Sequence, residues 1–347
     1  MAARHPGGAL AVVLTAVLLA SACAADRSAE AAPGENPPVE LRAAHAQTPD
    51  HPYQVCGLEH MQRELADHPQ ANLSLEIFPS GQLGSNEENL EEIQAGSLDL
   101  SVPGLGSLTI FDDRIGALET AFSVEDQQEL QDLLDGEIGG ELIEPLRTTH
   151  NVRILGPLWA LGSRHITANR PITSPDDLAG SAMRTQQTAS SRATAEALGA
   201  TPTPVDFGEL YLALSQGLVQ AQENPLVQID TANLTEVQRY IMMTGHVVNV
   251  SILSMSESTY QELTDEQRQV LEAAADHAAA EVNQCIADAE EEILERWRAT
   301  DAIEVVGEDE LDMDAFREHA REVYTGEDSA YAEDWGELYL ELTEESR

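Results

Sequence analysis

Arginine is the residue type of this chain best suited to bind a small anion. The 347 residues include eighteen arginines and no lysine, against 62 aspartates and glutamates. A planar guanidinium presents parallel N–H donors that match both oxygens of a carboxylate, and this pair strengthens in a closed, drier cleft. Among so many acids, most arginines are expected to form surface ion pairs. An arginine in an enclosed position would therefore be well suited to pair with a carboxylate.

The familiar catalytic signatures are missing from the sequence. It has no histidine pair at metal-ligand spacing, no Cys-x-x-Cys, no Walker loop and no Gly-x-Ser-x-Gly elbow. Residues 103–106 contain Gly-x-Gly without the third glycine of a dinucleotide loop, so a turn after a strand explains them. Glu209 and His165 could act as acid and base in a hydrolase or lyase, but no nucleophile accompanies them. We expect no enzyme, no metal and no cofactor.

The formal net charge of −44 restricts the possible partners. Hydrophobic residues, 42% of the total, recur between the acids at helical and strand spacings, and the length suffices for two packed domains. No segment clusters the arginines into the basic face that nucleic-acid binding needs. The excess of acidic residues indicates a protein that works in concentrated salt, where repulsion between its carboxylates is screened over roughly 3 Å at about 1 M. A codon bias combined with an ordinary acidic secreted surface is the alternative.

The N-terminus has the layout of an export signal over residues 1–22, with a positive start and an apolar run too short to span a bilayer. The stretch Leu19–Cys23 resembles a bacterial lipobox, which predicts acylation of Cys23. Plain cleavage after Ala22 is the alternative. Residues 23–38 are rich in Ala, Glu and Pro and predict a flexible tether. We therefore expect a periplasmic or other extracytoplasmic protein that is anchored to the membrane by lipid.

The apolar spacing that follows predicts an α/β fold. Alternation of apolar and polar residues predicts strands, and helical spacing of apolar residues or capping pairs predict helices. The predicted elements are, in chain order, strand 39–43, helix 55–65, strand 73–77, capped helices 85–96 and 123–136, a turn with a helical start at 174–180, and helices 193–198 and 208–216. Strands that alternate with helices in this way are typical of sheets covered by helices.

One helix is expected to be unusually long. No glycine or proline occurs between Thr264 and Thr300, and Thr264 forms a capping box with Gln267, so a single helix of about 55 Å is predicted. Such a helix is longer than one small domain and is expected to brace two lobes. Cys56 and Cys285, the cysteines of the exported body, could form a disulfide in an oxidising compartment or remain buried thiols.

Five stretches in chain order resemble the extracytoplasmic solute receptors of tripartite ATP-independent periplasmic (TRAP) transporters, the DctP-type family. They are IFPSGQLG at 77–84, QAGSLD at 94–99, GSR at 162–164, SPDDLAG with the following MR at 174–184, and LGATPTP through FGELY to QENP at 198–225. Each stretch is short, but their order and spacing match the family from Val39 to Trp297.

The resemblance implies a two-lobed α/β periplasmic binding protein fold with a hinge cleft and a long helix that braces both lobes. Lobe I is expected from 39–161 plus 250–290, and lobe II from 162–249 plus 291–347. The implied function is to bind a carboxylate-bearing organic acid and deliver it, as a monomer, to the small and large TRAP membrane subunits. A lipid-tethered sensory or structural protein is the alternative, since a fold does not determine function.

Matching to the family's motifs also implies ligand contacts. Arg184 is expected to hold the ligand carboxylate, Arg164 to be a second cationic contact, Asn224 to hydrogen-bond from the opposite side, Phe207 to form an aromatic wall, and His45 to be a polar contact after the first strand.

The remaining motif positions bear on the ligand. Glu209 either caps its own helix or contacts ligand hydroxyls, and Gln186 either contacts ligand or packs. The run Thr185–Gln187 resembles members that bind sugar acids, whereas Ser85 and Gly104 replace acids of the sialic-acid-binding branches, which disfavours that ligand. C4-dicarboxylate-like acids, uronates and keto acids all remain open.

Overall fold

The computed structural model describes residues 36–327, 330–331 and 335–345. The predicted export signal 1–22, the predicted acylation site Cys23 and most of the predicted tether lie outside the described residues. No helix within the described ranges is long and apolar enough to cross a membrane.

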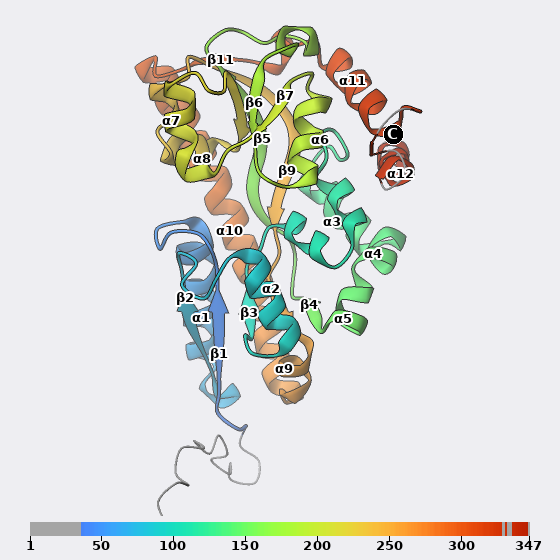
Figure 1. The fold of residues 1–347 in the computed structure, drawn as a ribbon. Helices are drawn as coiled ribbons and strands as arrows, with labels where there is room; N and C mark the ends of the chain where they lie inside the picture. Colours follow the sequence, from blue (N-terminus) through green and yellow to red (C-terminus); the bar gives the residue numbers. More distant parts are fainter. Residues whose placement is uncertain (1–35, 328–329, 332–334, 346–347) are drawn as a thin grey trace, which may run out of the picture.

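Two sheets organise the chain, one in each half of the molecule (Figure 1). The five-stranded sheet has the order β2 (Leu73–Phe78), β1 (Val39–Ala44), β3 (Leu100–Ser101), β10 (Ser254–Ser256), β4 (Val152–Ile154). The six-stranded sheet has the order β11 (Glu304–Val306), β9 (Tyr240–Ser251), β5 (Trp159–Ala168), β8 (Ala221–Asn224), β6 (Ala182–Thr185), β7 (Thr201–Pro204). We call the halves built on these sheets lobe I and lobe II.

Helices cover both sheets. They are α1 (Glu59–Asp67), α2 (Asn86–Ala95), α3 (Gln127–Asp135), α4 (Glu137–Leu142), α5 (Glu144–His150), α6 (Ala189–Ala197), α7 (Leu210–Ser215), α8 (Leu226–Thr231), α9 (Glu257–Glu262), α10 (Asp265–Thr300), α11 (Met313–Thr325) and α12 (Glu337–Glu345). A π-helix, η1 (Tyr53–Leu58), precedes α1, and short 3-10 segments are η2 (Pro69–Ala71), η3 (Leu105–Ile110), η4 (Asp113–Glu119), η5 (Pro175–Leu178), η6 (Phe207–Glu209), η7 (Leu234–Glu236) and η8 (Glu308–Glu310). The α/β prediction is confirmed.

Two predicted helix starts were wrong, since α6 begins at Ala189 rather than at 193 and α3 does not begin at Ser123. The helix expected to be capped by Ser123 is α3, and its N-cap is Asp126, whose carboxylate accepts a hydrogen bond from the Glu129 amide at 2.9 Å. The Ser123 hydroxyl is buried and donates instead to the carbonyls of Leu118 and Thr120. Both residues are good caps in sequence, and the choice between them depends on which one the preceding turn leaves free.

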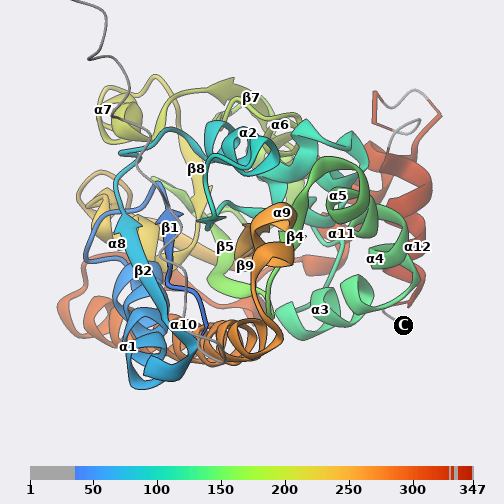
Figure 2. The ribbon, with the colours of Figure 1, turned by 90° about the horizontal axis from the view of Figure 1, so that it is seen from below.

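The long helix α10 braces both lobes, as predicted. It begins at the capping box of Thr264 and Gln267 and packs against η1 and α1 of lobe I and against β5 and α8 of lobe II. Figure 2 shows it running along one side of the molecule. A disulfide joins Cys56 of η1 to Cys285 of α10. This crosslink between positions far apart in sequence restricts the unfolded chain and ties lobe I to the brace.

The first residues that the structure describes are held against the N-terminal end of α10 by hydrogen bonds. The side chain of Asn36 accepts a hydrogen bond from the Thr264 hydroxyl at 2.6 Å, and the Pro37 carbonyl accepts one from the Gln267 side chain at 2.8 Å. Asn36 and Pro37 fall in the predicted tether, so at least its last residues are fixed by these contacts.

Besides α10 and the C-terminal segment that leads from β11 to α12, which packs on η4 of lobe I, the described chain crosses between the lobes at two neighbouring points. One crossing joins β4 to β5 and the other joins β9 to β10, and they are hydrogen-bonded to each other through the Leu155 amide and the Leu253 carbonyl at 2.8 Å. Side-by-side crossings of this kind are where a hinge between lobes can bend.

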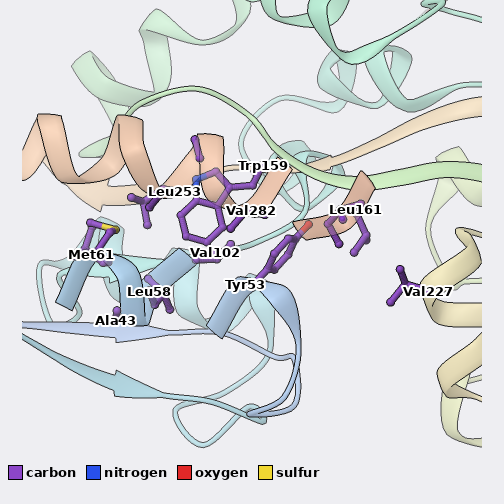
Figure 3. Close-up of a cluster of buried hydrophobic side chains, with 14 of the residues drawn as sticks. Ala43, Tyr53, Leu58, Met61, Val102, Trp159, Leu161, Val227, Leu253 and Val282 are labelled. Atoms are coloured by element: carbon purple, nitrogen blue, oxygen red, sulfur yellow. The ribbon is translucent and has the colours of Figure 1, made fainter. Parts of the chain in front are cut away.

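The core beside these crossings is tightly packed (Figure 3). Trp159 is fully buried where β5 begins, and its ring meets the Tyr53 ring edge-on at 5.7 Å between centroids. Gly57 in η1 lies against it so closely that a Cβ there would come within 2.5 Å of the indole and 2.8 Å of Val282. A side chain at this position would therefore push η1 away from α10 and β5.

Candidate functional site

A cavity of about 650 Å³ lies between the two lobes, and we call it the cleft. Its lobe I wall comes from the turn after β1, the start of α2, residues within 102–109, and Glu119 at the end of η4. Its lobe II wall comes from β5, residues within 186–194, β8 and β9. Within the part of the chain that the structure describes, no group of His, Cys, Asp and Glu side chains is arranged to hold a metal ion.

Two helices begin at the cleft, and they differ in charge. The N-cap of α6 is Thr188, whose Oγ1 accepts from the Ser191 amide at 3.2 Å, and the first turn of α6 contains no acid. The first turn of α2 contains Glu87 and Glu88. Because the N-terminal end of a helix carries partial positive charge, α6 gives the cleft an end that is favourable for an anion.

Arg164 is buried in β5, between two register shifts in the pairing of β5 with β9. Its Nε and Nη2 donate to the two carboxylate oxygens of Glu223, the second at 2.8 Å. Nη2 also donates to Asn224 Oδ1 and Nη1 to Asn249 Oδ1, each at 3.1 Å. The charge of Arg164 is thus balanced by the chain itself, and its guanidinium fixes the amides of two neighbouring strands.

Glu223 has a second partner in His246. Both side chains are buried, and His246 Nε2 lies 3.2 Å from Glu223 Oε2 while Nδ1 lies 2.7 Å from the Thr244 hydroxyl. Burial lowers the pKa of His246, so the neutral ring donates from Nε2 and accepts from Thr244. Burial alone would raise the pKa of Glu223, but Arg164 and His246 outweigh it and lower the pKa to about 2. Glu223 is therefore ionised throughout the neutral range.

Arg184, at the middle of β6, is buried without such a partner. Its Nε donates to the Val205 carbonyl at 2.8 Å, and its guanidinium carbon lies 5.8 Å from the centre of the Phe207 ring. It forms no ion pair with any residue that the structure describes. Burial and the nearby charge of Arg164 lower the pKa of Arg184 to about 10, against the opposing charges of Glu223 and Asp206, so Arg184 still carries its charge at neutral pH.

The structure brings some of the other predicted contacts to this region. Asn224 lies in β8 beside Arg164 and is buried, and Gln186 follows β6 and lines the cleft. Phe207 contacts Arg184 but is 44% exposed. Arg164 and Gln186 thus lie on the cleft wall, while Arg184, Asn224 and Phe207 lie behind or beside it.

Two predicted contacts lie away from the cleft wall. His45 is fully buried after β1, its Nε2 lies 2.9 Å from the Gln54 side-chain oxygen, and burial lowers its pKa. Glu209 is exposed at the start of α7, where its side chain makes no capping hydrogen bond. The residues after His45 do reach the cleft, so β1 points toward it even though this side chain does not line it.

Sequence reasoning missed Glu223 and Glu119. Glu223 lies in the Gln-Glu-Asn-Pro motif, and a carboxylate in the middle of a buried strand requires a cationic partner, which could have identified its pairing with Arg164. Glu119 accepts hydrogen bonds from Asn249 Nδ2 at 3.2 Å and from the Gly106 amide. Burial, opposed by Arg164, raises the pKa of Glu119 to about 7.

The chain is similar to solute receptors of known family. Residues 43–333 match the family of bacterial extracellular solute-binding proteins, family 7 (DctP). The sialic acid-binding periplasmic protein SiaP of Vibrio cholerae is 30% identical over 265 residues, which are 76% of this chain and 81% of SiaP. The C4-dicarboxylate-binding periplasmic protein DctP of Rhodobacter capsulatus is 30% identical over 212 residues, which are 60% of this chain and 62% of that protein.

A solved structure has the same fold. The TRAP periplasmic solute binding protein of Roseobacter denitrificans with bound 3-deoxy-D-manno-oct-2-ulosonic acid superimposes with a TM-score of 0.78 at 25% identity, covering 88% of this chain and 99% of that one. This likeness confirms the two-lobed α/β fold. The chain belongs to the DctP-type family of TRAP transporter solute-binding proteins.

Proposed function

We propose that this protein is the extracytoplasmic receptor of a TRAP transporter, closing its two lobes around a carboxylate-bearing organic acid and delivering it to the small and large membrane subunits. The observation that carries the proposal is Arg184, a buried and charged guanidinium without an ionic partner among the described residues. A buried charge is costly unless it is paired. The carboxylate of a ligand is the missing partner.

The two arginines have different roles in this proposal. Arg184, which lies beside the cleft wall, holds the ligand carboxylate once the lobes close, with the Phe207 ring against its guanidinium. Arg164 is a positioning residue, because Glu223 already neutralises it and its remaining N–H groups orient Asn224 and Asn249. The role is binding, with no covalent step. His45 and Glu209 remain predicted contacts that no geometry in the cleft supports.

The lining of the cleft favours a sugar acid over a dicarboxylate. Hydroxyl side chains line it from both lobes, including Ser85, Ser107 and Thr109 of lobe I and Thr188 and Ser190 of lobe II. Among the described residues, Arg164 is the one basic side chain on its wall, and it is already paired. A second ligand carboxylate would therefore lack a free cation. The hydroxyl groups already form hydrogen bonds within the chain, but each keeps a donor or an acceptor site that a ligand hydroxyl can use.

We also propose the cellular setting of the receptor. Residues 1–22 direct export, Cys23 carries the lipid anchor, and the mature protein is a monomer that works in concentrated salt. The chain divides as 39–161 plus 250–290 for lobe I and 162–249 plus 291–347 for lobe II. The family places such receptors outside the cytoplasm, which supports the export of this chain.

A thermal-shift screen in molar salt tests the proposed function. The panel contains uronates, aldonates, keto acids, C4-dicarboxylates and neutral sugars of the same size. A ligand at 100 times its Kd adds about 2.7 kcal/mol, which shifts Tm by several degrees. Stabilisation by sugar acids and not by their neutral analogues is expected. Stabilisation by neutral sugars alone, or by nothing in the panel, would contradict the receptor proposal.

A further inference from the structure

Glu119 lies on the cleft wall in a place that the sequence motifs did not single out. It ends η4, faces Arg164 and Asn249 across the lobe boundary, and is held by hydrogen bonds from Asn249 and the Gly106 amide. A Cβ at Gly106 would come within 2.2 Å of Glu119 Oε2. The Gly-x-Gly of residues 104–106 is thus explained, because its second glycine leaves room for this carboxyl group.

The charges around Glu119 leave it without a cation of its own. Facing it are Arg164 from β5, Glu223 from β8 and Tyr53 from η1, together with the neutral Asn249 side chain. Arg164 donates hydrogen bonds from Nε and Nη2 to Glu223, which remains ionised. Two carboxylates therefore share one guanidinium, an arrangement that disfavours ionisation of the second.

A bound organic acid adds a third carboxylate to this region. The cleft wall carries Arg164 against Glu87, Glu119 and Glu223, with Arg184 beside it, so a ligand carboxylate adds to an excess of negative charge. Protonation of Glu119 reduces that excess by one charge. The neutral carboxyl group also gains an O–H donor, which can bond a ligand hydroxyl that an ionised carboxylate could only accept from.

We infer that Glu119 is a specificity-determining residue of the cleft, which contacts the ligand as a neutral carboxyl group and takes up a proton when an organic acid binds. The inference rests on the proposed function, since it requires an anionic ligand between the lobes. Because burial already holds the pKa of free Glu119 at about 7, little free energy is needed to protonate it near neutral pH.

The sign of the pH dependence follows from this charge balance. An anionic ligand disfavours the ionised form, so ligand binding raises the pKa of Glu119 further and affinity falls as pH rises above about 7. The loss approaches tenfold per pH unit at most, for one proton. The buried His45, His165 and His246 have lowered pKa values and stay neutral in this range, so they do not produce the effect.

Isothermal titration calorimetry of the mature protein with D-glucuronate, or with the best sugar acid of the panel if D-glucuronate does not bind, tests the inference. Titrations run between about pH 6 and pH 8.5, in pairs of buffers with different ionisation enthalpies, so that the protons taken up per ligand are counted directly. We expect proton uptake near pH 7 and weaker binding at high pH. Glu119→Gln, which keeps the size and a neutral head group, should bind at high pH at least as tightly as the parent and should lose the pH dependence.

Glu290→Gln is the matched control. Glu290 lies on α10 outside the cleft wall, and burial raises its pKa to about 7 as well. This variant should keep the full pH dependence. Binding without proton uptake in the parent, pH dependence that survives Glu119→Gln, or pH dependence that disappears in Glu290→Gln would each overturn the inference. Failure of every acid to bind at any pH would instead overturn the proposed function.

Discussion

Arg164 and Arg184 are two buried arginines of lobe II, and their surroundings are opposite. Arg164 in β5 donates to both carboxylate oxygens of Glu223 and to two asparagine side chains. Arg184 in β6 has one backbone carbonyl and an aromatic ring. The first charge is committed to holding strands together, and the second is left available. Burial of an arginine alone therefore does not mark a candidate ligand contact, whereas burial without a directly paired carboxylate does.

The largest effect is expected from breaking the paired arginine. Arg164→Ala leaves the Glu223 carboxylate buried without its cation and should lower the free energy of unfolding by about 3–5 kcal/mol, as measured by urea denaturation. The double variant Arg164→Ala/Glu223→Ala should recover part of that loss, because it removes the unpaired charge. A single variant as stable as the parent would show that the pair does not hold β5 and β8 together.

Acid should break the same pair without mutation. The pKa of Glu223 is lowered from 4.5 to about 2 in the folded protein. Its contribution to stability is therefore fully present above about pH 4.5 and is lost as pH falls toward 2. The parent should lose more stability than the Arg164→Ala/Glu223→Ala variant over this interval. Equal losses in urea titrations across it would contradict the assignment.

A smaller effect is expected when Arg184 is replaced by lysine, which keeps the positive charge but lacks the planar guanidinium. Arg184→Lys cannot donate two parallel N–H bonds to a carboxylate, so the affinity for a sugar acid should fall by about 1.5–3 kcal/mol, the value of one charge-assisted hydrogen bond. Arg298→Lys, an exposed position on α10, is the control and should bind like the parent. Undiminished affinity in Arg184→Lys would mean that the bidentate contact is not made.

Salt should affect the repulsion between surface acids much more than the buried Arg164–Glu223 ion pair. At a net charge of −44 the acidic side chains repel one another, and salt screens this repulsion. Tm of the parent should therefore rise by several degrees between about 0.1 M and about 1 M NaCl. The stability difference between the parent and Arg164→Ala should change little, since a buried pair is screened weakly. A parent protein that is most stable at low salt would contradict the expectation of a protein adapted to concentrated salt.

Regular elements were predictable because their signals are local. The capping box at Thr264 and the absence of glycine and proline up to Thr300 predicted α10, and alternating apolar residues predicted β1 and β2. The start of α3 was placed at Ser123 rather than Asp126, since both residues can cap a helix and tertiary contacts decide between them.

The site was predictable only in part, because partners come from distant segments. The motif match predicted Arg164, Arg184 and Asn224 as ligand contacts, and the fold places the three on neighbouring strands. It did not reveal that Glu223 neutralises Arg164, a contact between residues 59 positions apart. Glu119 carried no local signal at all, since it ends a 3-10 segment without apolar periodicity and meets Arg164 only across the lobe boundary.

Calorimetric titration of the parent and of Arg184→Ala with the sugar acid that stabilises the parent most is the most direct test of the central claim. Loss of the buried guanidinium should weaken binding by about 2–5 kcal/mol. Tm of the ligand-free variant should stay close to that of the parent, because Arg184 has no ionic partner among the described residues to lose. Unchanged affinity in Arg184→Ala would remove Arg184 from the binding site and with it the distinction between the two arginines.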